Sequence, residues 1–201
     1  MRHIHKGQEP GALAAWRGPV RGGETRTWDG LPPPVKDTVR QALLSEQYHL
    51  CCYCGGRVAA HNSHIEHFQP QRFQARRFDY DNLLLSCNGK DHCGAAKGKW
   101  FDERLLVSPL DPRCEEYFDF GSDGSIAPAA ESPNAEAARQ TIAHLGLARV
   151  TAHRRAAIKA YVAWADASDD LDDLLQFLDE PDAQGELTPY CFAVRQVLCG
   201  R

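Results

Sequence analysis

The stretch HNSHIEHFQP, from His61 to Pro70, gathers His64, Glu66 and His67 around a single isoleucine. Imidazole and carboxylate groups are among the side chains that hold metal ions in proteins. A surface loop that collects polar residues by chance is the simpler alternative. Cysteine pairs on both sides of the stretch favour a metal site instead.

The alternation within HIEHF predicts a short strand with a polar tip. Glu66 and His67 are adjacent, so their side chains point to opposite sides of such a strand. The Glu66 carboxylate can then bind a divalent cation, Mg²⁺ or Mn²⁺, while the His67 imidazole takes a proton from water. That combination suffices for phosphodiester hydrolysis. We expect His64 to be structural or to face the substrate, and His61 to be solvated.

The cysteine pairs predict a structural zinc site. CCYCG holds Cys51 and Cys54 in the spacing of a zinc knuckle, and SCNGKDHCG holds Cys87 and Cys93. The alternative is four buried free thiols, since free cysteine is commonly buried. Cys52 does not fit the ligand spacing of the knuckle, so its side chain is expected to point into the core.

The segment between the cysteine pairs predicts the rest of the site. DNLLLSC is expected to form a buried strand that returns beside the first, with Asn82 at its start. Asn82 there would hydrogen-bond the backbone near His67 and fix the imidazole. HCGAAKGKW reads as the opening of a short helix, where His92 is placed to offer a second metal ligand.

Basic residues follow the proposed site and could hold phosphates beside the metal. A solvated loop with aromatic anchors is the alternative. The candidate nucleic-acid-binding residues are Arg72, Arg76, Arg77 and Lys97.

The organisation expected of the chain is an irregular N-terminal arm over 1–34, a core over 35–127 and a helical region over 128–201. A helix from Val35 to Tyr48 leads the core, and a hairpin with a turn at SDG closes it.

The length and composition of the chain are typical of a globular protein. It has 201 residues, 43% of them hydrophobic, eight cysteines and a net charge of −4. It contains no apolar run long enough to span a bilayer and no visible export signal, so a cytoplasmic location without a membrane partner is expected. In a reducing compartment, clustered cysteines bind metal more often than they form disulfides. A nucleic-acid partner needs only a local basic face.

The motif order resembles that of the HNH endonucleases with a ββα-metal core: CxxC, EH followed by proline, NL, a second cysteine pair and KG. More narrowly, CCYCG, HIEHFQP, DNLLLSC and HCGAAKG are similar to the retron- and Septu-associated HNH proteins of the PtuB type. QALLSEQ, VSPLDP and TIAHLGL extend the likeness over most of the chain. Residues 40–115 are the most specific part.

The resemblance implies an α+β fold, in which a small zinc-stabilised ββα-metal core lies between N-terminal and C-terminal helices. It implies that Glu66 is a metal ligand, that His67 is the general base and that Asn82 orients it. The cysteines at 51, 54, 87 and 93 would hold structural zinc. It also implies an ATPase partner, as in two-component antiphage defence.

One position departs from the family pattern. Many HNH proteins place Asn, His or Asp directly after the last cysteine as the second metal ligand, and this chain has Gly94 there. His92 is the nearest substitute, and Asn88 and Asp91 are weaker ones. Two hypotheses therefore stand: a metal-dependent nuclease of DNA or RNA, and a non-catalytic zinc-stabilised module that binds nucleic acid or a protein.

Overall fold

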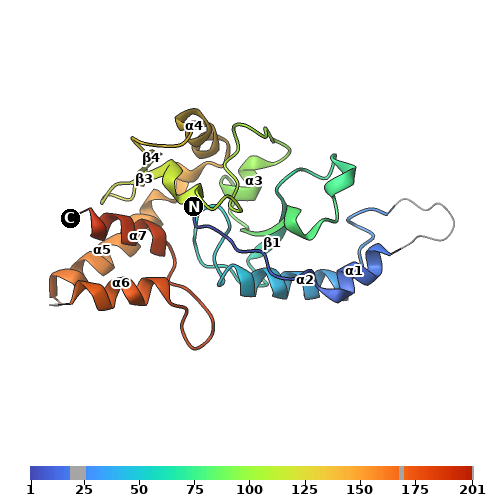
Figure 1. Cartoon of the computed structure of the whole chain (residues 1–201), viewed down its shortest axis with the longest axis horizontal. Coiled ribbons are helices and arrows are strands. Elements are labelled where there is room, and N and C mark those ends of the chain that lie inside the picture. Colours follow the sequence, from blue (N-terminus) through green and yellow to red (C-terminus); the bar gives the residue numbers. More distant parts are fainter. Residues whose placement is uncertain (19–25, 168–169, 201) are drawn as a thin grey trace.

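The computed structural model describes residues 1–18, 26–167 and 170–200. Figure 1 shows its helices and strands in their order along the chain. The helices are α1 (Gly11–Arg17), α2 (Pro33–Glu46), α3 (Cys93–Lys97), α4 (Ala135–His144), α5 (Thr151–Ala167), α6 (Leu171–Asp179) and α7 (Cys191–Cys199). The strands are β1 (Ser63–His67), β2 (Leu83–Cys87), β3 (Phe118–Phe120) and β4 (Ile126–Pro128).

A two-stranded sheet followed by a short helix forms the centre of the molecule. Strands β1 and β2 pair antiparallel, with Glu66 opposite Leu84 and Ser63 opposite Cys87. The apolar run Leu83–Leu85 is fully buried, which explains why three consecutive positions of this strand are hydrophobic rather than alternate ones. Helix α3 begins six residues after β2 and packs against it. The predicted α+β core is therefore present as a small ββα unit.

The first cysteine pair lies in a tight turn that packs on the sheet. The Cys52 N–H donates to the carbonyl of Leu85, and Cys52 is buried as expected. Gly55 closes the turn with φ of +72°, a conformation that favours glycine. A Cβ at this position would lie 2.3 Å from the ring of Phe192, so helix α7 also requires glycine here.

Helix α2 corresponds to the predicted leading helix, but its first and last residues differ from the prediction. It starts two residues earlier than Val35, at Pro33. Proline is tolerated at the first position of a helix, because the backbone N–H of that position has no hydrogen-bond partner within the helix. It ends before Tyr48, since Tyr48 and His49 have positive φ values. Its buried positions are Val39, Leu43 and Leu44.

The N-terminal arm is more ordered than expected. Helix α1 lies in the segment predicted to be irregular, and its buried residue is Leu13. Seven residues with one buried position give too weak a periodic pattern to predict a helix from sequence. Met1 and Ile4 are also buried, and the Ile4 N–H donates to the carbonyl of Pro109. Residues 19–25 of this arm lie outside the described part of the chain.

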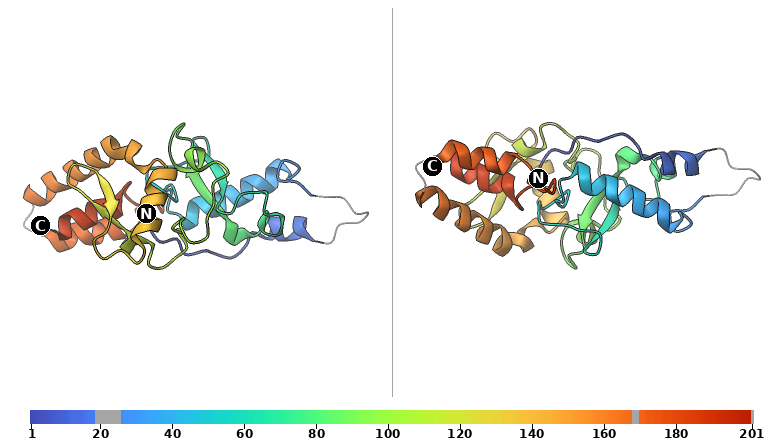
Figure 2. Two further views of the ribbon diagram at one scale, coloured as in Figure 1. Left: turned by 90° about the horizontal axis from the view of Figure 1, so that it is seen from above. Right: turned by 90° about the horizontal axis from the view of Figure 1, so that it is seen from below.

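The C-terminal helices build a second hydrophobic cluster at one end of an elongated molecule (Figure 2). Helices α5, α6 and α7 contribute Ile158, Leu174, Leu178 and Leu198 to it. The β3–β4 hairpin turns at Gly124, as the SDG signal predicted, and packs its Phe120 against this cluster. Residues 168, 169 and 201 of this region are outside the described part. Within the described ranges, none of the helices has the length and apolar character needed to cross a membrane.

Candidate functional site

The four cysteines of the two predicted pairs converge on one point. The sulfur atoms of Cys51, Cys54, Cys87 and Cys93 all lie within 4.8 Å of one another. Zn–S bonds of about 2.3 Å in a tetrahedron place sulfur atoms about 3.8 Å apart, which is close to this arrangement. The cluster can therefore bind a metal ion and is compatible with structural zinc.

The charge state of Cys51 agrees with a cation site. Burial alone would raise the pKa of its thiol, but hydrogen bonds from the neighbouring cysteines, among them Cys54 and Cys87, hold the pKa well below its usual range. Cys51 is thus favoured as a thiolate, the form of cysteine that binds metal.

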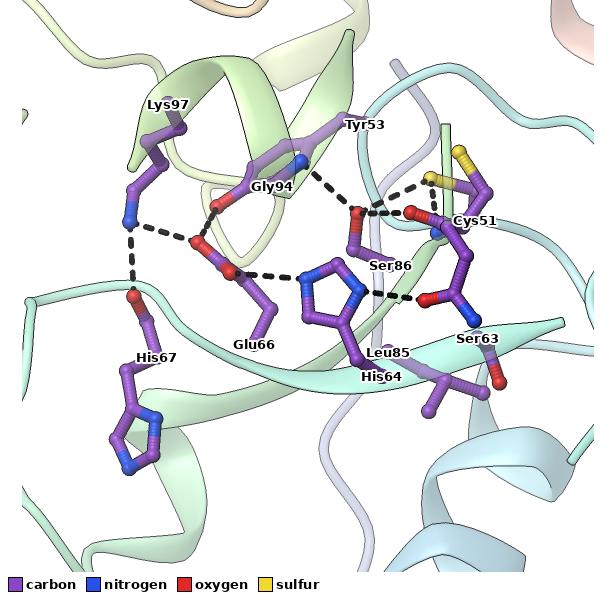
Figure 3. A network of polar contacts seen from close by, with 12 residues as sticks. Cys51, Tyr53, Ser63, His64, Glu66, His67, Leu85, Ser86, Gly94 and Lys97 are labelled. Atoms are coloured by element: carbon purple, nitrogen blue, oxygen red, sulfur yellow. Dashed lines mark hydrogen bonds and ion pairs between the residues drawn. The ribbon is translucent and has the colours of Figure 1, made fainter. Parts of the chain in front are cut away.

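Glu66 lies on β1 with its carboxylate directed at α3 (Figure 3). Its Oε1 accepts hydrogen bonds from Lys97 Nζ at 2.7 Å and from the Tyr53 hydroxyl at 3.2 Å. Burial raises the pKa of this carboxyl, but His64 and Lys97 more than offset the effect, so the pKa lies below its usual value. Glu66 is therefore ionised at neutral pH and able to bind a cation.

Lys97 is buried in the site rather than exposed on a nucleic-acid-binding face. Only 2% of the residue is accessible, and its ammonium also donates to the carbonyl of His67 at 2.9 Å. Lys97 follows Cys93 by one helical turn, so both side chains share the inner face of α3. Lys97, predicted to contact nucleic acid, is therefore not exposed for such a contact in this structure.

His67 is held as a neutral base. Its Nε2 lies 3.0 Å from the carbonyl oxygen of Arg77, which can only accept, so Nε2 carries the hydrogen and Nδ1 the lone pair. Its ring packs edge-on against Trp28, with the centroids 4.5 Å apart. Burial lowers the pKa of the imidazole to about 4, although the Arg77 carbonyl pulls it upward. At neutral pH the ring is uncharged and can accept a proton.

Asn82 positions the loop after β1 through the backbone. Its Oδ1 accepts from the Gln69 N–H at 2.7 Å, and its Nδ2 donates to the carbonyls of Gln69 and Arg76. This loop carries Arg77, whose carbonyl meets His67. Asn82 thus hydrogen-bonds the backbone near His67, and it reaches the imidazole only through that loop.

A cavity of about 510 Å³ opens over the site. Glu66 and His67 both line it, although Figure 3 shows their side chains on different sides of the strand. Arg72 and Lys99 lie at its exposed side, where the Arg72 guanidinium donates to the Lys99 carbonyl. The cavity therefore combines a carboxylate, a neutral imidazole and positively charged side chains.

The other two predicted nucleic-acid-binding arginines have protein partners. The Arg77 guanidinium donates to the backbone carbonyls of Gln71 and Arg26, which ties the loop together. Arg76 pairs with Asp79 at 3.2 Å and remains about two-fifths exposed at its side chain. Arg72 is the predicted arginine that lies directly at the cavity.

The structure brings His64, and not His92, to Glu66. His64 Nε2 lies 3.4 Å from Glu66 Oε2, whereas His92 precedes α3 and pairs with Asp91 at 3.2 Å. In this structure the histidine in contact with Glu66 is therefore His64, and His92, the expected second ligand, contacts Asp91 instead. The sequence held a signal for His64: residues two apart on a strand share a face. Tyr53 was also missed, and no sequence pattern marked it.

No protein-family model matches the chain. A protein of Vibrio cholerae serotype O1 biovar El Tor, named "Retron Vc95 putative HNH endonuclease", is 32% identical to it over 101 residues. The aligned part is 47% of this chain and 48% of the relative, so the chain spans about half the length of the protein it matches. This similarity supports a nuclease of the HNH type, and the ββα unit beside a metal-binding cysteine cluster is consistent with it.

Proposed function

We propose that the protein is a metal-dependent HNH-type endonuclease that hydrolyses phosphodiester bonds in nucleic acid. The observation that carries the proposal is the pairing of an ionised Glu66 with a neutral His67 in one cavity. The cysteine cluster supports the strand and helix that hold them, and the HNH relative supports the same chemistry.

In the proposed mechanism, His67 acts as the general base. Nδ1 takes the proton of the attacking water, and the Arg77 carbonyl keeps the ring oriented by accepting the Nε2 hydrogen. Lys97 keeps Glu66 anionic. A Mg²⁺ or Mn²⁺ ion held by Glu66 would supply positive charge for the phosphate and the leaving oxygen. Arg72 and Lys99, at the mouth of the cavity, would bind the flanking phosphates.

We further propose that residues 35–127 form the nuclease core and that the chain works in a retron- or Septu-like antiphage system with an ATPase partner. The relative's retron name supports this setting. The net charge of −4 also fits a nuclease that gains part of its substrate affinity within a complex.

A zinc-stabilised binding module is the second candidate. Two observations favour it: Lys97 already neutralises Glu66, and Gly94 offers no side chain to a metal. In that case the cavity would hold nucleic acid without cutting it.

Cleavage of supercoiled plasmid DNA and of total tRNA with Mn²⁺ distinguishes the two candidates. The nuclease proposal predicts that the zinc-loaded wild type cuts one of them and that Glu66→Gln and His67→Ala lose about 100-fold or more in rate. His61→Ala is the matched control, because His61 is exposed and outside the cavity. Cutting that survives both site variants would refute the assignment. If the protein binds nucleic acid but does not cut it, even when the ATPase partner is present, the result would favour the non-catalytic binding module.

A further inference from the structure

Gly94 is a position where the site has no room for a side chain. A Cβ there would lie 2.5 Å from His64 Nε2 and 2.8 Å from Glu66 Oε2, both shorter than real Cβ contacts. Any other residue would displace the ring, the carboxylate or both. The glycine therefore lets His64 and Glu66 approach each other over the start of α3.

His64 is oriented by a partner on its far side. Its Nδ1 lies 3.0 Å from Oδ1 of Asn88, and an amide oxygen only accepts, so Nδ1 carries the hydrogen. Nε2 faces Glu66 and offers a lone pair to a cation whenever the ring is neutral. A hydrogen bond from an outer residue that fixes one ring nitrogen while the other faces an ion is the usual arrangement of histidine ligands.

The two carboxylate oxygen atoms of Glu66 contact different side chains. Oε1 accepts hydrogen bonds from Lys97 and Tyr53, while Oε2 faces His64 Nε2 at 3.4 Å. When the imidazole is neutral both facing atoms are acceptors, and either a proton on Nε2 or a metal cation between them makes the contact favourable. Two atoms bonded to one ion at about 2.1 Å lie roughly 3.0 to 3.4 Å apart at bond angles of about 90 to 110°. The observed spacing fits that range.

We propose that His64 Nε2 and Glu66 Oε2 together hold the divalent cation of the site, with Asn88 as the positioning residue for His64. The proposal rests on the proposed nuclease function and names the second ligand that Gly94 cannot supply. A nitrogen ligand also affects the metal preference: imidazole suits transition metals such as Fe²⁺, Ni²⁺ and Zn²⁺, whereas Mg²⁺ prefers a shell of oxygen atoms. A site with one nitrogen and one oxygen ligand accordingly favours first-row transition ions over Mg²⁺, and Mn²⁺ serves as the probe of that class.

Binding of Mn²⁺ to zinc-loaded protein tests this without any nuclease substrate. The electron paramagnetic resonance signal of free Mn²⁺ falls as the ion is bound, which gives stoichiometry and affinity. We expect one Mn²⁺ per wild-type chain, poorly displaced by Mg²⁺. His64→Ala should weaken binding about 100-fold, and Asn88→Ala about 10-fold with recovery in Asn88→Asp. His92→Ala is the matched control and should bind as the wild type does.

Gly94→Ala is the second variant, since it keeps both ligands and places a methyl group between them. It should lose Mn²⁺ affinity while keeping its zinc content. Wild-type affinity in His64→Ala or Gly94→Ala would overturn the proposal. If Glu66→Gln loses Mn²⁺ while His64→Ala retains it, the inference about His64 fails and the proposed function stands. If the wild type binds no Mn²⁺, or Glu66→Gln binds it normally, the metal site of the proposed function fails as well.

Discussion

Lys97→Met removes the positive partner of a buried carboxylate and tests the electrostatics of the site. The ammonium lies 2.7 Å from Glu66 Oε1, with side-chain exposures of 1% and 9%. At an effective dielectric constant of about 20, the attraction between such charges is roughly 6 kcal/mol before the cost of burying them. Removal of one member of a buried pair costs about 3 to 5 kcal/mol. Because Tyr53 still donates to Glu66, we expect a loss of about 3 kcal/mol at pH 8.

The loss should depend on pH in a defined direction. In the wild type the folded pKa of Glu66 is below its usual value, so this carboxylate stabilises the fold above that usual value and the stabilisation is lost as pH falls through the folded pKa. Without Lys97 one of the two groups that lower the pKa of Glu66 is lost while His64 remains, so the pKa in the variant lies above that in the wild type and a fall in pH destabilises the variant less. The difference between variant and wild type should therefore narrow from pH 8 to pH 5.

Urea unfolding of zinc-loaded protein at both pH values measures this difference. Lys99→Met is the matched control, because Lys99 is exposed and should change the free energy of unfolding by less than about 0.5 kcal/mol. The double variant Glu66→Gln/Lys97→Met should recover most of the loss, since it leaves no unpaired charge. A Lys97→Met protein as stable as the wild type at pH 8 would refute the electrostatic account.

Four further predictions concern the supports of the site. Cys87→Ala should lose the zinc measured by mass spectrometry and melt at lower temperature, because the ion contributes folding energy; unchanged melting would contradict this. Gly55→Ala should lower stability by about 2 kcal/mol or more in urea, since its Cβ would strike Phe192; a neutral effect would refute that packing. Asn82→Ala, which frees three backbone groups, should slow cleavage of the substrate and cost about 1 to 3 kcal/mol of stability in urea unfolding. Because the pKa of His67 is lowered to about 4, cleavage should not fall through protonation of the base until pH approaches that value, whereas a fall centred near 6.5 in the rate profile would contradict it.

The local parts of the core follow from sequence because their causes are local. The spacing of Cys51 and Cys54 predicts the turn, and the unbroken apolar run Leu83–Leu85 predicts the buried strand. The alternation within HIEHF predicts β1, and the structure pairs it with β2 as expected. Each of these features depends on residues only a few positions apart.

Other parts of the site depend on contacts between distant residues. Lys97 and Glu66 are 31 positions apart, so nothing in the sequence marks their ion pair. The contact between His64 and Glu66 depends on the space at Gly94, which the packing of α3 against the sheet creates. Helix α1 gave no periodic signal, because it has one buried side chain, Leu13, which packs on a core built mostly from later residues.

Chemical rescue of His67→Gly tests the central claim, that the imidazole of His67 takes the proton from water in a nuclease reaction. The variant leaves space beside Trp28 that free imidazole can enter. With Mn²⁺, the zinc-loaded variant should cut the wild-type substrate about 100-fold or more slowly than the wild type, and added imidazole should restore part of the rate. The control His61→Gly should cut at the wild-type rate, with or without imidazole. Cleavage by His67→Gly at the wild-type rate without imidazole would contradict the account.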